Sequence, residues 1–321
     1  MGSTRIHIKP DDCLANVDEI ADGSEPRSRM KYYIVPYGPH GINETCEANY
    51  YIGNRVPYHE HSSGFETFLV DGGAIEVMSL SKKAAARKGD IVHISPYTPH
   101  SIHTLEDESI WRAFHQGLWL ADRMISERAL RDRHWDAVFV PEFKKNSDIR
   151  NGSEWFDYLH PECKDVPASE MPCIRPFDFA ISDYAFDGIT LKLKVGRWET
   201  KGAKEVWQLH LNSGYTLSWD ELHPFTHLYD VFSGSLRVTL EGMDSFIANA
   251  RDLLHIPMYH SGRIEALEDT VLLDMGCQGF LTRFMDALYT CKVKEPARLK
   301  DTAYIRDMMT KYDYHVMFES F

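Results

Sequence analysis

Residues 53–73 read GNRVPYHEHSSGFETFLVDGG and combine two histidines, an acidic residue and several glycines at close spacing. His59 and His61 are two positions apart, so on an extended strand both imidazoles point to the same face. The SSG turn that follows lets the chain reverse, and Glu66 then lies on the next strand, facing the same cavity. The stretch therefore predicts two adjacent strands that bring two imidazoles and a carboxylate together.

A fourth candidate donor follows further along the chain. His100 ends the stretch SPYTPH, residues 95–100, whose two prolines favour a turn. Three imidazoles and one carboxylate inside a small barrel form a mixed nitrogen and oxygen site for a divalent transition metal. We expect His59, His61, Glu66 and His100 to bind one such ion per chain, with Fe(II) favoured and Mn, Zn or Ni as alternatives.

The spacing is informative only as a whole. Histidine accounts for 16 of 321 residues, so an HxH pair is expected by chance and carries no weight alone. A glycine six positions before the first histidine and an acidic residue five positions after the second make the complete pattern rare. We therefore treat the four residues as one constellation.

Two strand-rich blocks of the sequence resemble each other. Residues 89–107, GDIVHISPYTPHSIHTLED, match residues 251–269, RDLLHIPMYHSGRIEALED, and VDGGAIEV from Val70 matches VFSGSLRV from Val231. The two matches occur in the same order in both blocks. An internal repeat of this kind predicts a duplicated β-domain.

The repeat sets the predicted organisation. We expect an all-β chain with two tandem barrels, in which residues 118–135 are helical because their apolar residues recur at helical intervals. The predicted parts are an N-terminal arm (1–30), a first barrel with the metal site (31–118), a helical linker (119–173), a second barrel with a degenerate site (174–285), and a C-terminal helix and tail (286–321).

The segment around His59 resembles the first cupin motif, G(X)5HXH(X)3-4E(X)6G, and the segment ending at His100 resembles the second. With the repeat, the chain is similar to bicupins, a group that includes quercetin and gentisate-type dioxygenases, oxalate decarboxylases and seed storage proteins. The resemblance implies a double-stranded β-helix, or jelly roll, with ligands on its inner face. The second motif departs from the family where Tyr97 and Thr98 stand in place of a glycine.

The donor set favours an enzyme. Four protein ligands leave about two positions on an octahedral ion, as inner-sphere activation requires. We expect a non-haem Fe(II) dioxygenase, an oxidoreductase acting on a small aromatic or enolic acid, with Glu66 as anionic ligand and proton acceptor. The alternative is a metal-dependent isomerase, lyase or hydrolase acting on a sugar acid or keto acid without O2. A non-catalytic ligand-binding bicupin is disfavoured, because storage cupins usually lack the ligands.

Other positions are candidates for the pocket or for a second site. Tyr51 and Arg55 share strand parity with His59 and would line the cavity if no bulge intervenes. In the second block, His223, His227 and His260 offer imidazoles but no HxH pair. We expect the second barrel to be structural, with a vestigial pocket.

Composition limits the partners and the compartment. The net charge of −13 argues against nucleic acid or an anionic membrane as partner, and a small-molecule substrate is expected. No signal-peptide core occurs and the six cysteines form no CxxC pair, so a cytoplasmic location with reduced thiols is expected. The apolar ending YHVMFESF, residues 314–321, predicts a homodimer in which a partner covers it.

Overall fold

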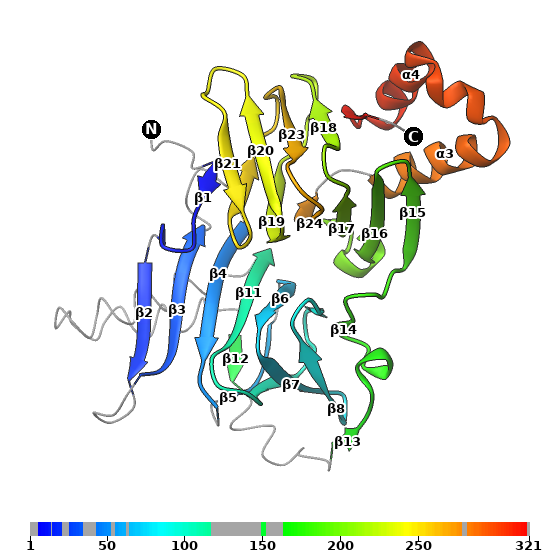
Figure 1. The fold of residues 1–321 in the computed structure, drawn as a ribbon. Coiled ribbons are helices and arrows are strands. Elements are labelled where there is room, and N and C mark those ends of the chain that lie inside the picture. The colour runs from blue at the N-terminus through cyan, green and yellow to red at the C-terminus, as the bar shows by residue number, and fades with distance from the viewer. Residues whose placement is uncertain are drawn as a thin grey trace. The chain divides into compact units, whose positions relative to one another are not determined.

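The computed structural model describes residues 6–13, 15–20, 26–34, 43–52, 55–61, 64–116, 149–151, 163–277 and 281–319, and the statements below concern these residues. Strands dominate the chain (Figure 1). The chain divides into two compact units. The first comprises Met1–Thr4 and Asp12–Asp178, and the second comprises Arg5–Asp11 and Phe179–Phe321.

The first unit consists of two sheets. In spatial order they are β14-β9-β6-β11-β4-β3-β2 and β12-β5-β10-β7-β8-β13. The elements are β2 (Ala15–Ile20), β3 (Pro26–Ile34), β4 (Asn43–Tyr50), β5 (Arg55–His61), β6 (Glu66–Gly72), β7 (Ala74–Ser79), β8 (Lys82–Arg87), β9 (Ile91–Ile94), β10 (His100–Thr104), β11 (Ser109–Gln116), β12 (Ile149–Asn151), β13 (Lys164–Asp165), η2 (Ala168–Glu170) and β14 (Ile174–Arg175). Buried side chains such as Phe68, Val70 and Ile102 fill the unit's core.

The second unit has the same plan. Its sheets are β1-β22-β19-β24-β17-β16-β15 and β21-β20-β23-β18-β25. The elements are β1 (His7–Ile8), β15 (Ser182–Phe186), β16 (Ile189–Val195), η3 (Arg197–Thr200), β17 (Glu205–Leu211), β18 (Thr216–Trp219), β19 (His227–Ser233), β20 (Ser235–Leu240), β21 (Phe246–Asn249), β22 (Leu253–Ile256), β23 (Gly262–Ala266) and β24 (Thr270–Cys277). The prediction of an all-β chain with two repeated β-domains is confirmed.

The chain ends in helices and one strand that pack on the second unit. These are α3 (Leu281–Lys294), η4 (Pro296–Lys300), α4 (Thr302–Tyr312) and β25 (Val316–Phe318), so helix begins within the range predicted for the second barrel. Tyr314, Val316 and Phe318 are buried in the core of the second unit, and β25 pairs with β18. The argument for a homodimer therefore falls away, because the tail is covered by its own chain. The homodimer itself stays a prediction.

Two short strands belong to a unit other than the one that follows them in the chain. The predicted N-terminal arm contains β1, β2 and part of β3, and β1 pairs with β22 of the second unit. In the same way, β14 precedes the second barrel in the chain but pairs with β9 of the first unit. The helix predicted over 118–135 lies outside the described residues, and the end of the predicted linker contains β13 and η2.

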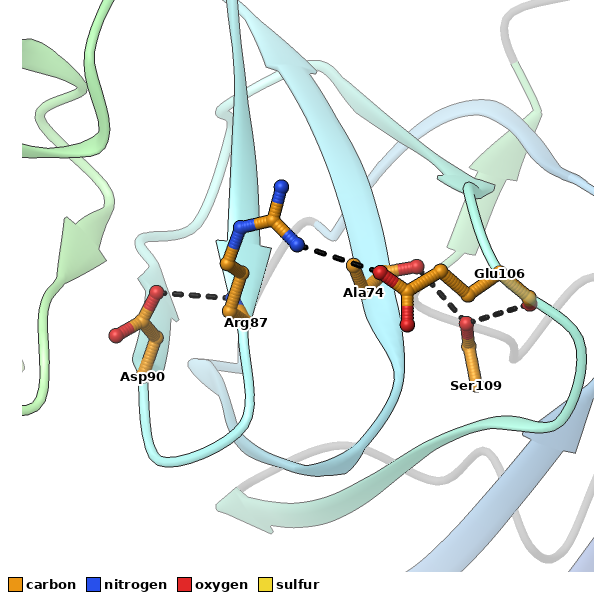
Figure 2. A network of polar contacts seen from close by, with 5 residues as sticks. All are labelled: Ala74, Arg87, Asp90, Glu106 and Ser109. Carbon is orange, nitrogen blue, oxygen red and sulfur yellow. Dashed lines mark hydrogen bonds and ion pairs between the residues drawn. The ribbon is translucent and has the colours of Figure 1, made fainter.

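Asp90 shows why the repeated segments share an aspartate. Its carboxylate accepts hydrogen bonds from the backbone N–H groups of Arg87 and Phe177, both at 2.9 Å, so it joins the β8–β9 turn to the segment after β14. Figure 2 shows this turn beside a second one, where Ser109 donates to the carbonyls of Ala74 and Glu106. Asp252 repeats the arrangement in the second unit, with the backbone N–H of Asn249 and the ring of His7.

Two further expectations concern cysteines and membranes. The structure describes all six cysteines, and none of them forms a disulfide. Among the described residues, neither helix is long and apolar enough to cross a membrane.

Candidate metal centre

The four predicted donors of the first barrel come together. His59 and His61 lie at the end of β5, Glu66 begins β6 and His100 begins β10. One donor atom from each of these residues lies within 4.8 Å of the others. All four side chains are buried, with 0–7% of their surface exposed. Side chains alternate along a strand, so His59 and His61 lie on the same face of β5. The third histidine, His100, joins them because it pairs with His59 across β10 and β5.

The donors are close enough to share one ion. The Oε2 atom of Glu66 lies 2.9 Å from Nε2 of His100 and 3.4 Å from Nε2 of His61. The ring centroids of His59 and His100 are 4.2 Å apart. Three imidazoles and a carboxylate are donors suited to a divalent transition metal, and burying them together without such an ion would be unfavourable. The residues fit a divalent metal ion.

A backbone carbonyl orients His100. Its Nδ1 atom lies 2.8 Å from the carbonyl oxygen of Thr98, which can only accept, so Nδ1 carries the proton. The Nε2 lone pair of His100 then faces Glu66. A histidine that binds metal commonly donates its other N–H in this way, which fixes both tautomer and ring orientation.

The turn before His100 forms without a glycine. Tyr97 has φ 59°, the left-handed conformation that glycine adopts most readily. Its backbone N–H donates to the carbonyl of His61 at 2.6 Å. This bond connects the second motif to the end of β5, close to the four donors. The hydrogen bond helps to hold Tyr97 in its strained backbone conformation.

A bulge intervenes in β5 between Val56 and His59. The β10–β5 register shifts between His100 and Ile102, so that Ile102 pairs with Val56. Val56 packs against the hydrophobic core. Tyr51 is half-buried beyond the end of β4, and its carbonyl accepts a hydrogen bond from Thr104 at 2.7 Å. A pocket role for Tyr51 or Arg55 remains a prediction.

The second barrel lacks two of the four donors. Trp219 pairs with Gly262 where His59 pairs with His100 in the first barrel. A side chain at position 262 has no room, because a Cβ there would lie 2.9 Å from the Trp219 indole.

Histidines occupy two of the equivalent donor positions in the second barrel. Tyr259, which also has φ 59°, donates its N–H to the carbonyl of His223, so His223 corresponds to His61. His227 pairs with Ile256 as Glu66 pairs with Ile94, and it therefore corresponds to Glu66. The third predicted residue, His260, is exposed and lies apart from this group.

The structure adds two donors that the sequence did not single out. Asp274 and Cys277 lie on β24, and together with His227 they form a group whose donor atoms all lie within 4.8 Å of one another. Asp274 pairs with Tyr229 where Ala113 pairs with Phe68 in the first barrel. A charged residue inside the apolar run TVLLDMGC, residues 270–277, was the available signal.

Burial lowers the pKa values of two basic residues, His223 and Lys204, in the second barrel. Burial lowers the pKa of His223 to about 2, so its imidazole is neutral. Burial also lowers the pKa of Lys204 to about 7, although the negative charge of Asp274 acts in the opposite direction. Both residues lie in the interior, with 1% and 3% of their surface exposed.

Comparison with known proteins identifies the fold. No protein-family model matches the chain, and no curated protein matches its sequence. Solved structures do match. A variant of the Bacillus subtilis oxalate decarboxylase is 18% identical, with a TM-score of 0.53 over 99% of this chain and 89% of the other. The Lactobacillus farciminis oxalate decarboxylase is 15% identical, with a TM-score of 0.52 over 85% and 86%.

A third similar structure is not described as an enzyme. The 11S globulin of Wrightia tinctoria is 9% identical, with a TM-score of 0.53 over 85% of this chain and 84% of the globulin. Identities this low show the fold alone. The chain is a two-domain cupin-fold protein, as the motif predicted.

Proposed function

We propose that this chain is a metal-dependent lyase that acts on a small carboxylic acid in its first barrel. The observation that carries the proposal is the buried convergence of His59, His61, Glu66 and His100. The fold comparison supports the lyase alternative more than the expected Fe(II) dioxygenase, because two of the similar structures are oxalate decarboxylases. The seed globulin has the same fold, so the donor set, and not the fold, argues for an enzyme.

The charge of the site favours an anionic substrate. Three neutral imidazoles and one carboxylate leave a net positive charge when a divalent ion is held among them. The ion would supply Lewis acidity toward a substrate carboxylate oxygen. Fe(II), Mn, Zn and Ni all suit this donor set, and the experiment below compares them.

The protein's own residues orient the site and hold a proton. The Thr98 carbonyl fixes the tautomer of His100, so the Nε2 lone pair faces inward. The Glu66 carboxylate lies within 3.4 Å of two imidazole nitrogens and is the acidic member of the group. It can therefore serve as a ligand and as a proton acceptor.

The test is a reaction balance. Protein loaded separately with each metal would be incubated with mono- and dicarboxylic acids, oxalate among them, in air and under argon, while CO2 release and O2 uptake are recorded. We expect CO2 release without equimolar O2 uptake, abolished in Glu66→Ala and unchanged in His260→Ala. Equimolar O2 uptake would instead support the dioxygenase, and no turnover of any acid with any metal would reject the proposal.

A further inference from the structure

The second barrel contains a buried donor group that differs from a cupin metal site. Trp219 and Gly262 replace two donors, whereas His227 retains a donor position with a different residue type. Asp274 and Cys277 contribute from β24, which pairs with β19. The donors of this group therefore lie on β19 and β24, whereas Trp219 and Gly262 occupy the equivalent positions of His59 and His100 on β18 and β23.

All members of this group are removed from water. His227 and Cys277 have no exposed surface, and Asp274 is 1% exposed. A buried carboxylate requires a compensating positive charge or strong hydrogen bonds. The Oδ2 atom of Asp274 lies 2.5 Å from Nδ1 of His227, so this edge of the imidazole faces the carboxylate.

The opposite edge of His227 already has a partner. Its Nε2 atom lies 2.8 Å from Nε2 of His223, and the two rings are nearly parallel, at 6°. One proton can lie between these two nitrogens. The Asp274 carboxylate accepts in its bond with His227, so Nδ1 of His227 carries the proton when no metal is bound. A metal ion held by both atoms would replace this proton, and His227 would then donate from Nε2 to His223.

His223 supplies a second observation. It is 1% exposed, and among the described residues its Nδ1 atom has no hydrogen-bond partner. The hydrogen bonds from His223 through His227 to Asp274 lie beside a thiol, because the Sγ atom of Cys277 is within 4.8 Å of a donor atom of both His227 and Asp274.

We propose that the second barrel binds a thiophilic divalent ion of the zinc class through His227, Asp274 and Cys277, with His223 holding His227 in place. One imidazole, one carboxylate and one thiolate are donors that zinc accepts, and the two anions neutralise its charge. Its ligands are closed off from solvent, as in a structural metal site, so the ion would stabilise the folded barrel. It adds a second metal of a different class to the one ion expected per chain, and it does not depend on the proposed function.

Cobalt distinguishes the two barrels, because the first-barrel donors include no sulfur. Full-length protein stripped of metal would be titrated with Co(II), and the near-ultraviolet thiolate-to-cobalt charge-transfer band recorded. We expect the band in the wild type and in Glu66→Ala, and its loss in Cys277→Ser. Cys173→Ala, which changes a buried cysteine of the first unit, is the matched control and keeps the band.

A second readout covers the case in which the cysteine variant does not fold. Asp274→Asn keeps the side-chain shape but removes a charge, and we expect it to weaken Co(II) binding at this site at least 10-fold. Zn(II) should raise the Tm of the wild type more than that of this variant. Absence of the charge-transfer band in the wild type, or its persistence in Cys277→Ser, would overturn the proposal and leave a metal-free hydrogen-bonded chain.

Discussion

Gly262 lies opposite Trp219 at the register point where His100 lies opposite His59 in the first barrel. The indole occupies space next to the glycine, so a side chain at position 262 is excluded. This pairing removes two of the four donors of a cupin metal site from the second barrel, although the backbone turn beside it is kept. The two barrels share a fold but differ in their donor sets.

Gly262→Ala tests how closely this pair is packed. The new Cβ would lie 2.5 Å from Cδ2 of Leu240 and 2.9 Å from the Thr239 carbonyl oxygen, which is part of the backbone and cannot easily move. We expect a loss of about 1–3 kcal/mol in the free energy of unfolding, measured by urea denaturation. Gly72→Ala is the control, because its nearest contacts are ordinary ones at 3.7 Å. Equal stability of the two variants would contradict the close packing.

His100→Ala and Glu66→Ala test the first-barrel site. Both should fold, because the donors line the interior while the strands are held by the surrounding core. We expect His100→Ala to bind metal more weakly through three remaining donors, and Glu66→Ala to lose the anionic ligand. Activity should fall by orders of magnitude in both. Metal content by elemental analysis, with circular dichroism as the folding control, decides the outcome.

His260→Ala is the matched control in the second barrel. This imidazole is exposed, so metal content, turnover and stability should stay near the wild-type values. If this change abolished activity while the first-barrel changes were mild, the active site would lie in the second barrel.

Tyr97 tests the left-handed turn. A β-branched residue tolerates φ 59° poorly, so Tyr97→Val should be less stable than the wild type by about 1 kcal/mol or more. Tyr97→Gly should be tolerated, because glycine adopts this conformation without strain. The free energies of unfolding of the two variants give the comparison. A valine variant as stable as the glycine variant would show that the turn relaxes.

Cys173 gives a prediction for alkaline pH. Burial raises the pKa of its thiol from 9.0 to about 11. Between these values the unfolded chain releases the proton while the folded chain keeps it, so this residue's contribution to stability falls as pH rises from about 9 to 11. As pH rises across that window, the free energy of unfolding of the wild type, measured by denaturation, should therefore fall relative to that of Cys173→Ala. A constant difference would contradict the raised pKa.

The repeat and the first-barrel donors could be predicted from the amino-acid sequence alone. Strand alternation places His59 and His61 on one face, and the motif spacing adds Glu66 and His100. The matched segments around Asp90 and Asp252 predicted the duplication, and in the structure each aspartate accepts a hydrogen bond from the backbone N–H three residues before it.

Features that depend on pairing between distant strands could be read only from the folded structure. The bulge in β5 lies between the pairs His100–His59 and Ile102–Val56, and no local pattern encodes it. The group of His227, Asp274 and Cys277 forms because β19 and β24 are neighbours, although they are far apart in sequence. Strand alternation specifies which face a side chain occupies, but only the folded sheet determines which other side chains share that face.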